Sequence, residues 1–121
     1  MIKVYNCKVE DHTSEPNNYY IGRPSILSNP FTYDGKKSNL ARLSFKTREE
    51  CLSAYEVYFK QMYESDIEFK AAFDEIYEKY KNGEDIYLQC FCKPLPCHGD
   101  IIARELQKKL VKEILDKKRA Q

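Results

Sequence analysis

The segment from Cys90 to His98, with the sequence CFCKPLPCH, most constrains how this chain can fold and act. It holds three of the five cysteines and one of the two histidines. A β-branched and aromatic run, IYLQ, precedes it at 86–89, and an amphipathic helical pattern follows it. This order predicts a strand–turn–helix unit whose turn carries soft metal ligands and nucleophiles. In an α/β protein, ligands usually bind at this carboxyl end of a strand.

The rest of the chain predicts one small α/β domain over residues 1–121, with a Rossmann-like sheet of few strands and about three helices. Because a helical region separates the strands expected at 2–7 and 86–91, we expect them to lie side by side and parallel. A third short strand is expected at 19–21, and 22–46 should form a long loop with little regular structure. Helices are expected over about 48–63, from a capping box at 65–68 to Asn82-Gly83, and over about 99–118.

Composition excludes several classes of function. The formal net charge of +1 argues against general nucleic-acid binding. The sequence has no run of about 18 apolar residues, which a membrane-spanning helix needs, and its first residues do not resemble a signal peptide. We therefore expect a protein of the cytoplasm. Since a sheet of so few strands leaves open edges, a homo-oligomer or a partner protein could complete it.

The cysteine- and histidine-rich turn allows several interpretations. Cys90, Cys92, Cys97 and His98 have the right chemistry for a zinc site, although four ligands within nine residues would be strained. Alternatively, Cys97 or Cys92 is a catalytic thiolate, activated by His98 or by the amino end of the following helix. The turn could also hold a phosphate on its backbone N–H groups. Finally, the cysteines could simply pack as small apolar residues.

A second group of polar residues follows the expected strand at 19–21. Gly22 permits close backbone approach, Arg23 suits a phosphate or a carboxylate, and Ser25 and Asn29 offer hydrogen bonds. Together they predict a ligand-binding loop that faces a phosphate. The simpler alternative is an ordinary turn that Arg23 ties to a nearby carboxylate.

The two groups together resemble a family of small phage and bacterial proteins that is known only as a domain of unknown function. The shared motifs are IGRxS at 21–25, NPF at 29–31 and CxCxPxPCHGD at 90–100. Two positions depart from the family pattern: Ser28 replaces the usual glycine, and Phe91 replaces the usual tryptophan. Ser28 could stiffen the loop against close approach of a ligand. The pairing of a Gly-Arg loop with a strand–turn–helix site also resembles nucleotide-handling domains, which is an analogy of fold only.

The length, the Lys- and Tyr-rich composition and the whole-chain character also resemble a small phage anti-defence protein. That resemblance implies an inhibitor that binds a large host defence protein, a sirtuin-domain NADase, in the host cytoplasm without a cofactor. On this interpretation the cysteine- and histidine-rich turn is inherited scaffold. The alternative is a protein that binds or processes a nucleotide or nucleoside, with Arg23 on the phosphate and Cys97 and His98 at the reacting centre, with or without zinc.

Overall fold

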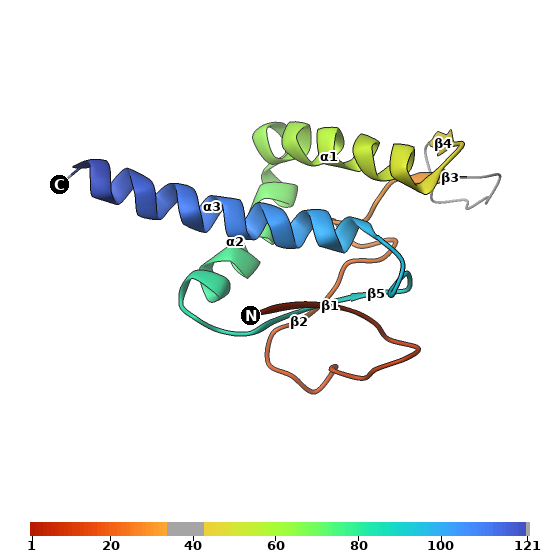
Figure 1. The fold of residues 1–121 in the computed structure, drawn as a ribbon, viewed down its shortest axis with the longest axis horizontal. Coiled ribbons are helices and arrows are strands. Elements are labelled where there is room, and N and C mark those ends of the chain that lie inside the picture. The colour runs from red at the N-terminus through yellow and green to blue at the C-terminus, as the bar shows by residue number, and fades with distance from the viewer. Residues whose placement is uncertain (34–42, 121) are drawn as a thin grey trace.

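The computed structural model describes residues 1–33 and 43–120, and it has the expected mixture of strands and helices (Figure 1). Three parallel strands form a sheet in the order β1-β5-β2, so the predicted α/β class is confirmed. None of the described helices is long and apolar enough to cross a membrane. The elements are β1 (Ile2–Asn6), β2 (Asn18–Tyr20), β3 (Phe31–Tyr33), β4 (Leu43–Phe45), α1 (Arg48–Ser65), α2 (Ile67–Lys81), β5 (Ile86–Cys90) and α3 (His98–Ala120).

The central strand of the sheet is β5, as its apolar sequence suggests. It pairs with β1 from Ile2 opposite Ile86 to Asn6 opposite Cys90. The predicted parallel pairing of these two segments is therefore confirmed. On its other side β5 pairs with β2, which begins one residue before the predicted strand and is also parallel. Because all three strands run the same way, their carboxyl ends share one edge of the sheet, and the chain enters the turn before α3 from that edge.

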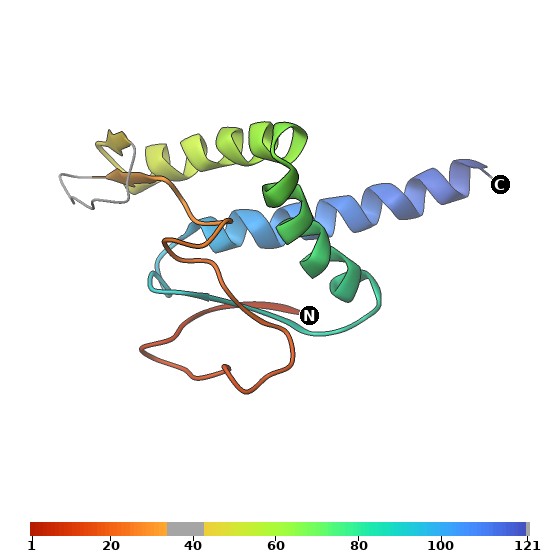
Figure 2. The same ribbon diagram turned by 180° about the vertical axis from the view of Figure 1, so that it is seen from behind.

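The two faces of the sheet are covered differently. All three helices lie on one face, while the segment 7–17 loops across the other (Figures 1 and 2). Alternate residues of β5, namely Ile86, Leu88 and Cys90, are buried in the core beneath the helices. On the opposite face, the His12 ring packs against the rings of Tyr5 and Tyr87.

The helix ends follow from short side-chain caps. Thr47 caps α1, which begins at the predicted residue 48, because its side chain accepts a hydrogen bond from the Glu50 backbone N–H at 3.2 Å. The predicted cap of the second helix at Ser65 is wrong. Asp66 caps α2 by accepting from the Phe69 N–H at 2.9 Å, while the Ser65 hydroxyl donates to the Gln61 carbonyl within α1. The second helix ends at the predicted Asn82-Gly83.

The prediction of little regular structure over 22–46 is confirmed over 22–30, which holds no helix or strand, and is wrong at 31–33 and 43–45. The short strands β3 and β4 pair in parallel, with Phe31 opposite Leu43. The Phe31 ring packs edge-to-face against the rings of Phe45 and Tyr58, so this small sheet rests on α1. Residues 34–42 of the predicted loop lie outside the described part of the chain.

Candidate anion-binding pocket

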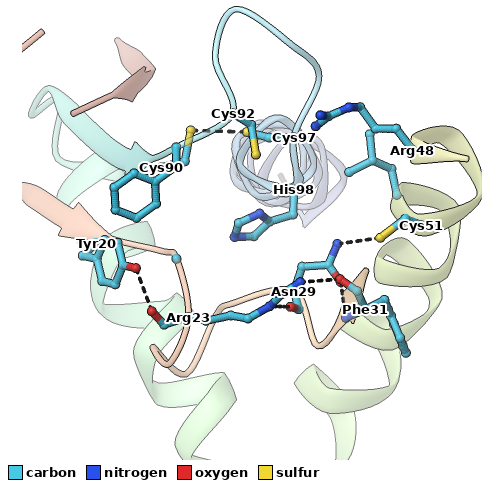
Figure 3. A pocket seen from close by; sticks show the side chains of 13 residues that line it. Tyr20, Arg23, Asn29, Phe31, Arg48, Cys51, Cys90, Cys92, Cys97 and His98 are labelled. Atoms are coloured by element: carbon cyan, nitrogen blue, oxygen red, sulfur yellow. Dashed lines mark hydrogen bonds between the residues drawn. The ribbon is translucent and has the colours of Figure 1, made fainter. Parts of the chain in front are cut away.

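The two polar groups predicted from the sequence meet at one pocket of about 350 Å³. It lies where β5 ends, between the turn before α3, the segment after β2 and the first turns of α1 (Figure 3). Parallel sheets commonly bind ligands at this position, outside the carboxyl ends of their strands. The pocket is lined by Tyr20, Gly22, Arg23, Asn29, Phe31, Arg48, Cys51, Leu52, Cys90, Phe91, Cys92, Cys97 and His98.

The turn between β5 and α3 is held by hydrogen bonds from neighbouring elements. The Asn6 side-chain amide, at the end of β1, donates to the carbonyls of Phe91 at 3.2 Å and Lys93 at 3.1 Å. Arg48, at the start of α1, donates to the Pro96 carbonyl at 2.9 Å. The carboxylate of Asp100 accepts from the Cys97 backbone N–H at 3.1 Å. These contacts fix the positions of the three thiols relative to the pocket.

The three thiols of the turn form a hydrogen-bonded group and no disulfide. The Cys97 Sγ lies 3.7 Å from the Cys90 Sγ, to which it donates. A hydrogen bond from the Cys97 thiol lowers the pKa of both Cys90 and Cys92. The pKa of Cys97 is raised in turn, because its single proton hydrogen-bonds to one neighbouring sulfur or the other and because the side chain is buried. Cys97 is therefore the proton donor of the group, and the anionic character belongs to its partners.

His98, the first residue of α3, is buried and committed to the protein backbone. Its Nε2 lies 2.6 Å from the carbonyl oxygen of Ile21, to which it donates when the ring is neutral. Burial lowers the pKa of His98 to about 4, which the hydrogen bond to Ile21 partly offsets. The imidazole is thus neutral at pH 7. It joins α3 to the segment after β2, and its edge packs against the Tyr55 ring.

The zinc interpretation does not fit this arrangement. No group of three or more His, Cys, Asp or Glu side chains in the described part of the chain is placed to hold a metal ion. One ring nitrogen of His98 is occupied by the Ile21 carbonyl, which leaves only its Nδ1 for a metal ion. Zinc would need deprotonated thiols converging on a tetrahedral centre.

The segment after β2 is tied together by Arg23, though not through a carboxylate. Its Nε donates to the Asn29 carbonyl at 2.9 Å, and its Nη2 donates to the Phe31 carbonyl at 2.5 Å. The Asn29 side chain donates to the Cys51 Sγ at 3.5 Å and accepts from the Phe31 N–H at 3.0 Å. Two backbone carbonyls thus take the place of the expected carboxylate, and Arg23 lies in the wall of the pocket (Figure 3).

Gly22 and Ser25, the other two residues predicted to bind a ligand, are placed differently. A Cβ at position 22 would lie only 2.4 Å from the Tyr20 hydroxyl oxygen, so glycine lets the Tyr20 ring fold over this wall. The Tyr20 hydroxyl there donates to the Arg23 carbonyl at 2.7 Å. Ser25 lies outside the pocket, and its hydroxyl is buried without a hydrogen-bond partner among the described residues.

Comparison with known protein families identifies the family to which this chain belongs. The family of the domain of unknown function DUF4326 matches residues 5–108. The chain belongs to the DUF4326 family. The match contains every residue that lines the pocket, so the pocket lies in the part of the chain that defines the domain. No curated protein and no solved structure matches the chain.

Sequence reasoning missed several residues of the DUF4326 pocket. Arg48 was visible only as the residue after a helix cap, and Tyr20 only as part of a strand. Cys51 is buried in the core, yet it also lines the pocket. The available signal for Arg48 was its place at a helix amino end, where an exposed cation is electrostatically unfavourable unless another contact holds it.

Proposed function

We propose that the DUF4326 pocket of this protein binds a nucleotide or a similar phosphate-bearing molecule with an aromatic ring. The observation that carries the proposal is the combination of two arginines with exposed aromatic rings in one pocket. Arg23 and Arg48 line it from different elements, and neither Asp nor Glu is among the described lining residues. Guanidinium groups match the geometry of phosphate oxygens, so the side of the pocket that carries the two arginines suits an anion, while the acidic thiols of Cys90 and Cys92 lie on the side of the turn.

The aromatic side of the pocket supports a base rather than inorganic phosphate alone. The rings of Tyr20 and Phe91 meet edge-to-face at 5.8 Å, and both side chains are substantially exposed. Exposed aromatic rings offer faces on which a base can stack, an interaction of about 1–3 kcal/mol in single-stranded nucleic-acid complexes. A volume of about 350 Å³ lies at the small end of the usual range for ligand pockets.

The proposal is tested by calorimetric titration of the protein with AMP, ATP, GTP, NAD and inorganic phosphate. At least one nucleotide should bind, and Arg48→Met should weaken it at least tenfold, which corresponds to about 1.4 kcal/mol. Arg104→Met is the matched control, because it removes the same charge from an exposed arginine of α3 outside this pocket. The absence of binding at millimolar nucleotide would refute the proposal, and so would equal losses in both variants.

The aromatic wall is tested separately. Tyr20→Leu removes a stackable ring while leaving both arginines in place, so it should weaken nucleotide binding more than phosphate binding. An equal loss for both ligands would mean that Tyr20 only positions Arg23, whose carbonyl it contacts.

We propose, as a second candidate, the inhibitor of a sirtuin-domain NADase that the sequence resemblance suggests. One observation favours a protein-binding role. The last turns of α3 project beyond the other elements (Figures 1 and 2), and Val111, Ile114 and Leu115 are about half exposed there. All three lie outside the residues that match the DUF4326 family. Exposed apolar clusters of this kind are typical of interaction surfaces.

The inhibitor proposal is tested by assaying NAD hydrolysis by a sirtuin-domain defence NADase with increasing amounts of this protein. Leu115→Glu should abolish inhibition, whereas Arg48→Met should preserve it. Inhibition that survives Leu115→Glu would remove α3 from the interface, and no inhibition at any ratio would refute the candidate.

A further inference from the structure

The three thiols at the end of β5 all line the pocket but differ in exposure, and Cys92 is the most exposed of them. Cys90 and Cys97 are almost completely buried, with exposed fractions of 1% and 2%. Cys92 is partly exposed and lines the pocket. A molecule bound in the pocket can therefore reach the sulfur of Cys92 more readily than those of its neighbours.

The groups around Cys92 favour its deprotonated form. The Cys97 thiol donates a hydrogen bond to it, and the guanidinium of Arg48 donates another from the first turn of α1. Arg23 adds a second positive charge across the pocket. A cation and hydrogen-bond donors are the surroundings that stabilise a thiolate in reactive cysteines. The other titratable groups facing this site are Tyr20 from β2, Cys90 from β5, Cys51 from α1 and His98 from α3.

Cys97 cannot play the attacking role itself. Its sulfur is buried, keeps the single proton that it donates to Cys90 or to Cys92, and accepts a hydrogen bond from the Gly99 backbone N–H. It therefore acts on its neighbours as a hydrogen-bond donor, and its proton turns to Cys92 when that sulfur is the ionised one. The Nε2 of His98 cannot act as the base that deprotonates Cys92, since that nitrogen is hydrogen-bonded to the Ile21 carbonyl.

We propose that Cys92 is the nucleophile of this pocket, held as a thiolate by Arg48 and the Cys97 thiol and directed at an electrophilic carbon of the bound molecule. In the step, the sulfur lone pair forms an S–C bond, and the bond from that carbon to its leaving group breaks. The leaving group departs with the bonding electrons, so no oxidant or reductant is needed. The inference deepens the proposed nucleotide pocket and rests on it for the identity of the natural substrate.

The test uses iodoacetamide, which reports thiolate reactivity without knowledge of the substrate. The Cys92 sulfur displaces iodide from carbon, and the modified residue is identified by peptide mass spectrometry after brief labelling at pH 6. The pKa of Cys92 is lowered to about 6. Since an ordinary thiol is only about 0.3% ionised at pH 6, and a lower pKa weakens the nucleophile, we expect Cys92 to react about tenfold faster than a partly exposed ordinary thiol. Cys7 is partly exposed and lies outside the pocket, so it is the internal reference.

Four variants distinguish a stabilised thiolate at Cys92 from a thiol that reacts fast only because it is exposed. Arg48→Met should slow the labelling of Cys92 several-fold and leave Cys7 unchanged, whereas Arg104→Met should change neither. Cys97→Ala should also slow Cys92, and Cys97→Ser, which restores a hydrogen-bond donor, should recover most of the rate. Far-ultraviolet circular dichroism of each variant checks that it remains folded.

The inference is overturned if Cys92 labels no faster than Cys7 in the wild-type protein, or if Cys90 or Cys97 labels first. It is also overturned if Cys97→Ser and Cys97→Ala slow labelling equally in folded protein. These outcomes are independent of the calorimetric titrations. If the protein binds a nucleotide but Cys92 is labelled slowly, the proposed function stands and the assignment of Cys92 as nucleophile fails. If Cys92 is labelled fast but no nucleotide binds, the assignment of a reactive thiolate stands and the nucleotide proposal fails.

Discussion

His98 and Ile21 are joined by a hydrogen bond of 2.6 Å between the imidazole Nε2 and the backbone carbonyl, across 77 positions of sequence. The bond connects the first residue of α3 to the residue that follows β2. It closes the pocket at its base, because the elements on either side carry the thiols and Arg23. His98 is a residue type that often serves as a catalytic base or a metal ligand, but here its Nε2 forms a hydrogen bond that holds two segments of the fold together.

The first prediction concerns pH. Because the pKa of His98 falls from 6.5 in the unfolded chain to about 4 in the folded protein, the unfolded chain binds the proton more tightly. The contribution to stability is therefore complete above pH 6.5 and is lost progressively as pH falls toward 4. The free energy of unfolding should fall by about 2 kcal/mol between pH 7 and pH 5, measured by urea denaturation.

The control for this prediction is His98→Gln, because a glutamine amide can donate to the Ile21 carbonyl and does not titrate. This variant should lose most of the pH dependence between 7 and 5. If it keeps the full dependence, another group is responsible for the loss of stability.

The second prediction concerns Gly99 in the first turn of α3. Alanine is normally the better helix former by about 1 kcal/mol. However, a Cβ at position 99 would lie 2.7 Å from the side chain of Val4 in β1 and 2.8 Å from the side chain of Ile21, which belongs to the core. Gly99→Ala should therefore destabilise the protein by about 1–3 kcal/mol. Thermal unfolding measures the change, and Gln107→Ala, at an exposed site of the same helix, should have an effect within about 0.5 kcal/mol of zero.

The third prediction concerns the anchor of the segment between β2 and β3. The hydroxyl of Tyr55 is buried and donates to the Leu27 carbonyl at 2.7 Å. Tyr55→Phe keeps the ring but leaves this carbonyl without its partner, so it should cost about 1–3 kcal/mol of stability in urea unfolding. Tyr58→Phe changes a partly exposed tyrosine of the same helix and should cost less. Equal losses would show that the hydrogen bond is not the cause.

Local patterns predicted much of this fold. The apolar run before the cysteine-rich turn predicted β5, and its parallel pairing with β1 followed from the helical region between them. The start of α1 near residue 48 was predictable because its cap, the side chain of Thr47, contacts only nearby residues. In contrast, β3 and β4 are too short for a periodic signal, and their pairing depends on the contact of Phe31 with Tyr58, which is tertiary.

Most residues of the pocket could be predicted from the sequence, but their hydrogen-bond partners and the packing that brings them together could not. Gly22, Arg23, Asn29, Cys90, Cys92, Cys97 and His98 all line the pocket, whereas Ser25 does not. The sequence could not distinguish a phosphate ligand from the carbonyls that Arg23 contacts, because both accept the same hydrogen bonds. It also could not place Arg48, since that residue reaches the pocket only through the packing of α1. The predictions of a partner protein and of a homo-oligomer stay predictions.

The last prediction concerns Asp74, which links all three helices. Its carboxylate accepts from the Tyr63 hydroxyl at 2.7 Å on α1, from Lys109 at 3.0 Å on α3 and from Lys70 at 3.3 Å on α2. Burial would raise the pKa of Asp74, but these hydrogen bonds together lower it. The resulting stabilisation is present above the ordinary pKa of 3.8 and is lost as pH falls through the lower folded value.

Asp74→Asn should therefore cost about 1 kcal/mol at pH 7, a modest value because the site is partly exposed to solvent. The difference from wild type should narrow as pH falls below 3.8, provided that both proteins are still folded. A double-mutant cycle with Lys109→Met at pH 7 measures the pair directly, since the two losses should add to more than the loss in the double variant. Strictly additive losses would show that Lys109 is held by its contacts with the Tyr63 and Tyr77 rings and draws nothing from the carboxylate.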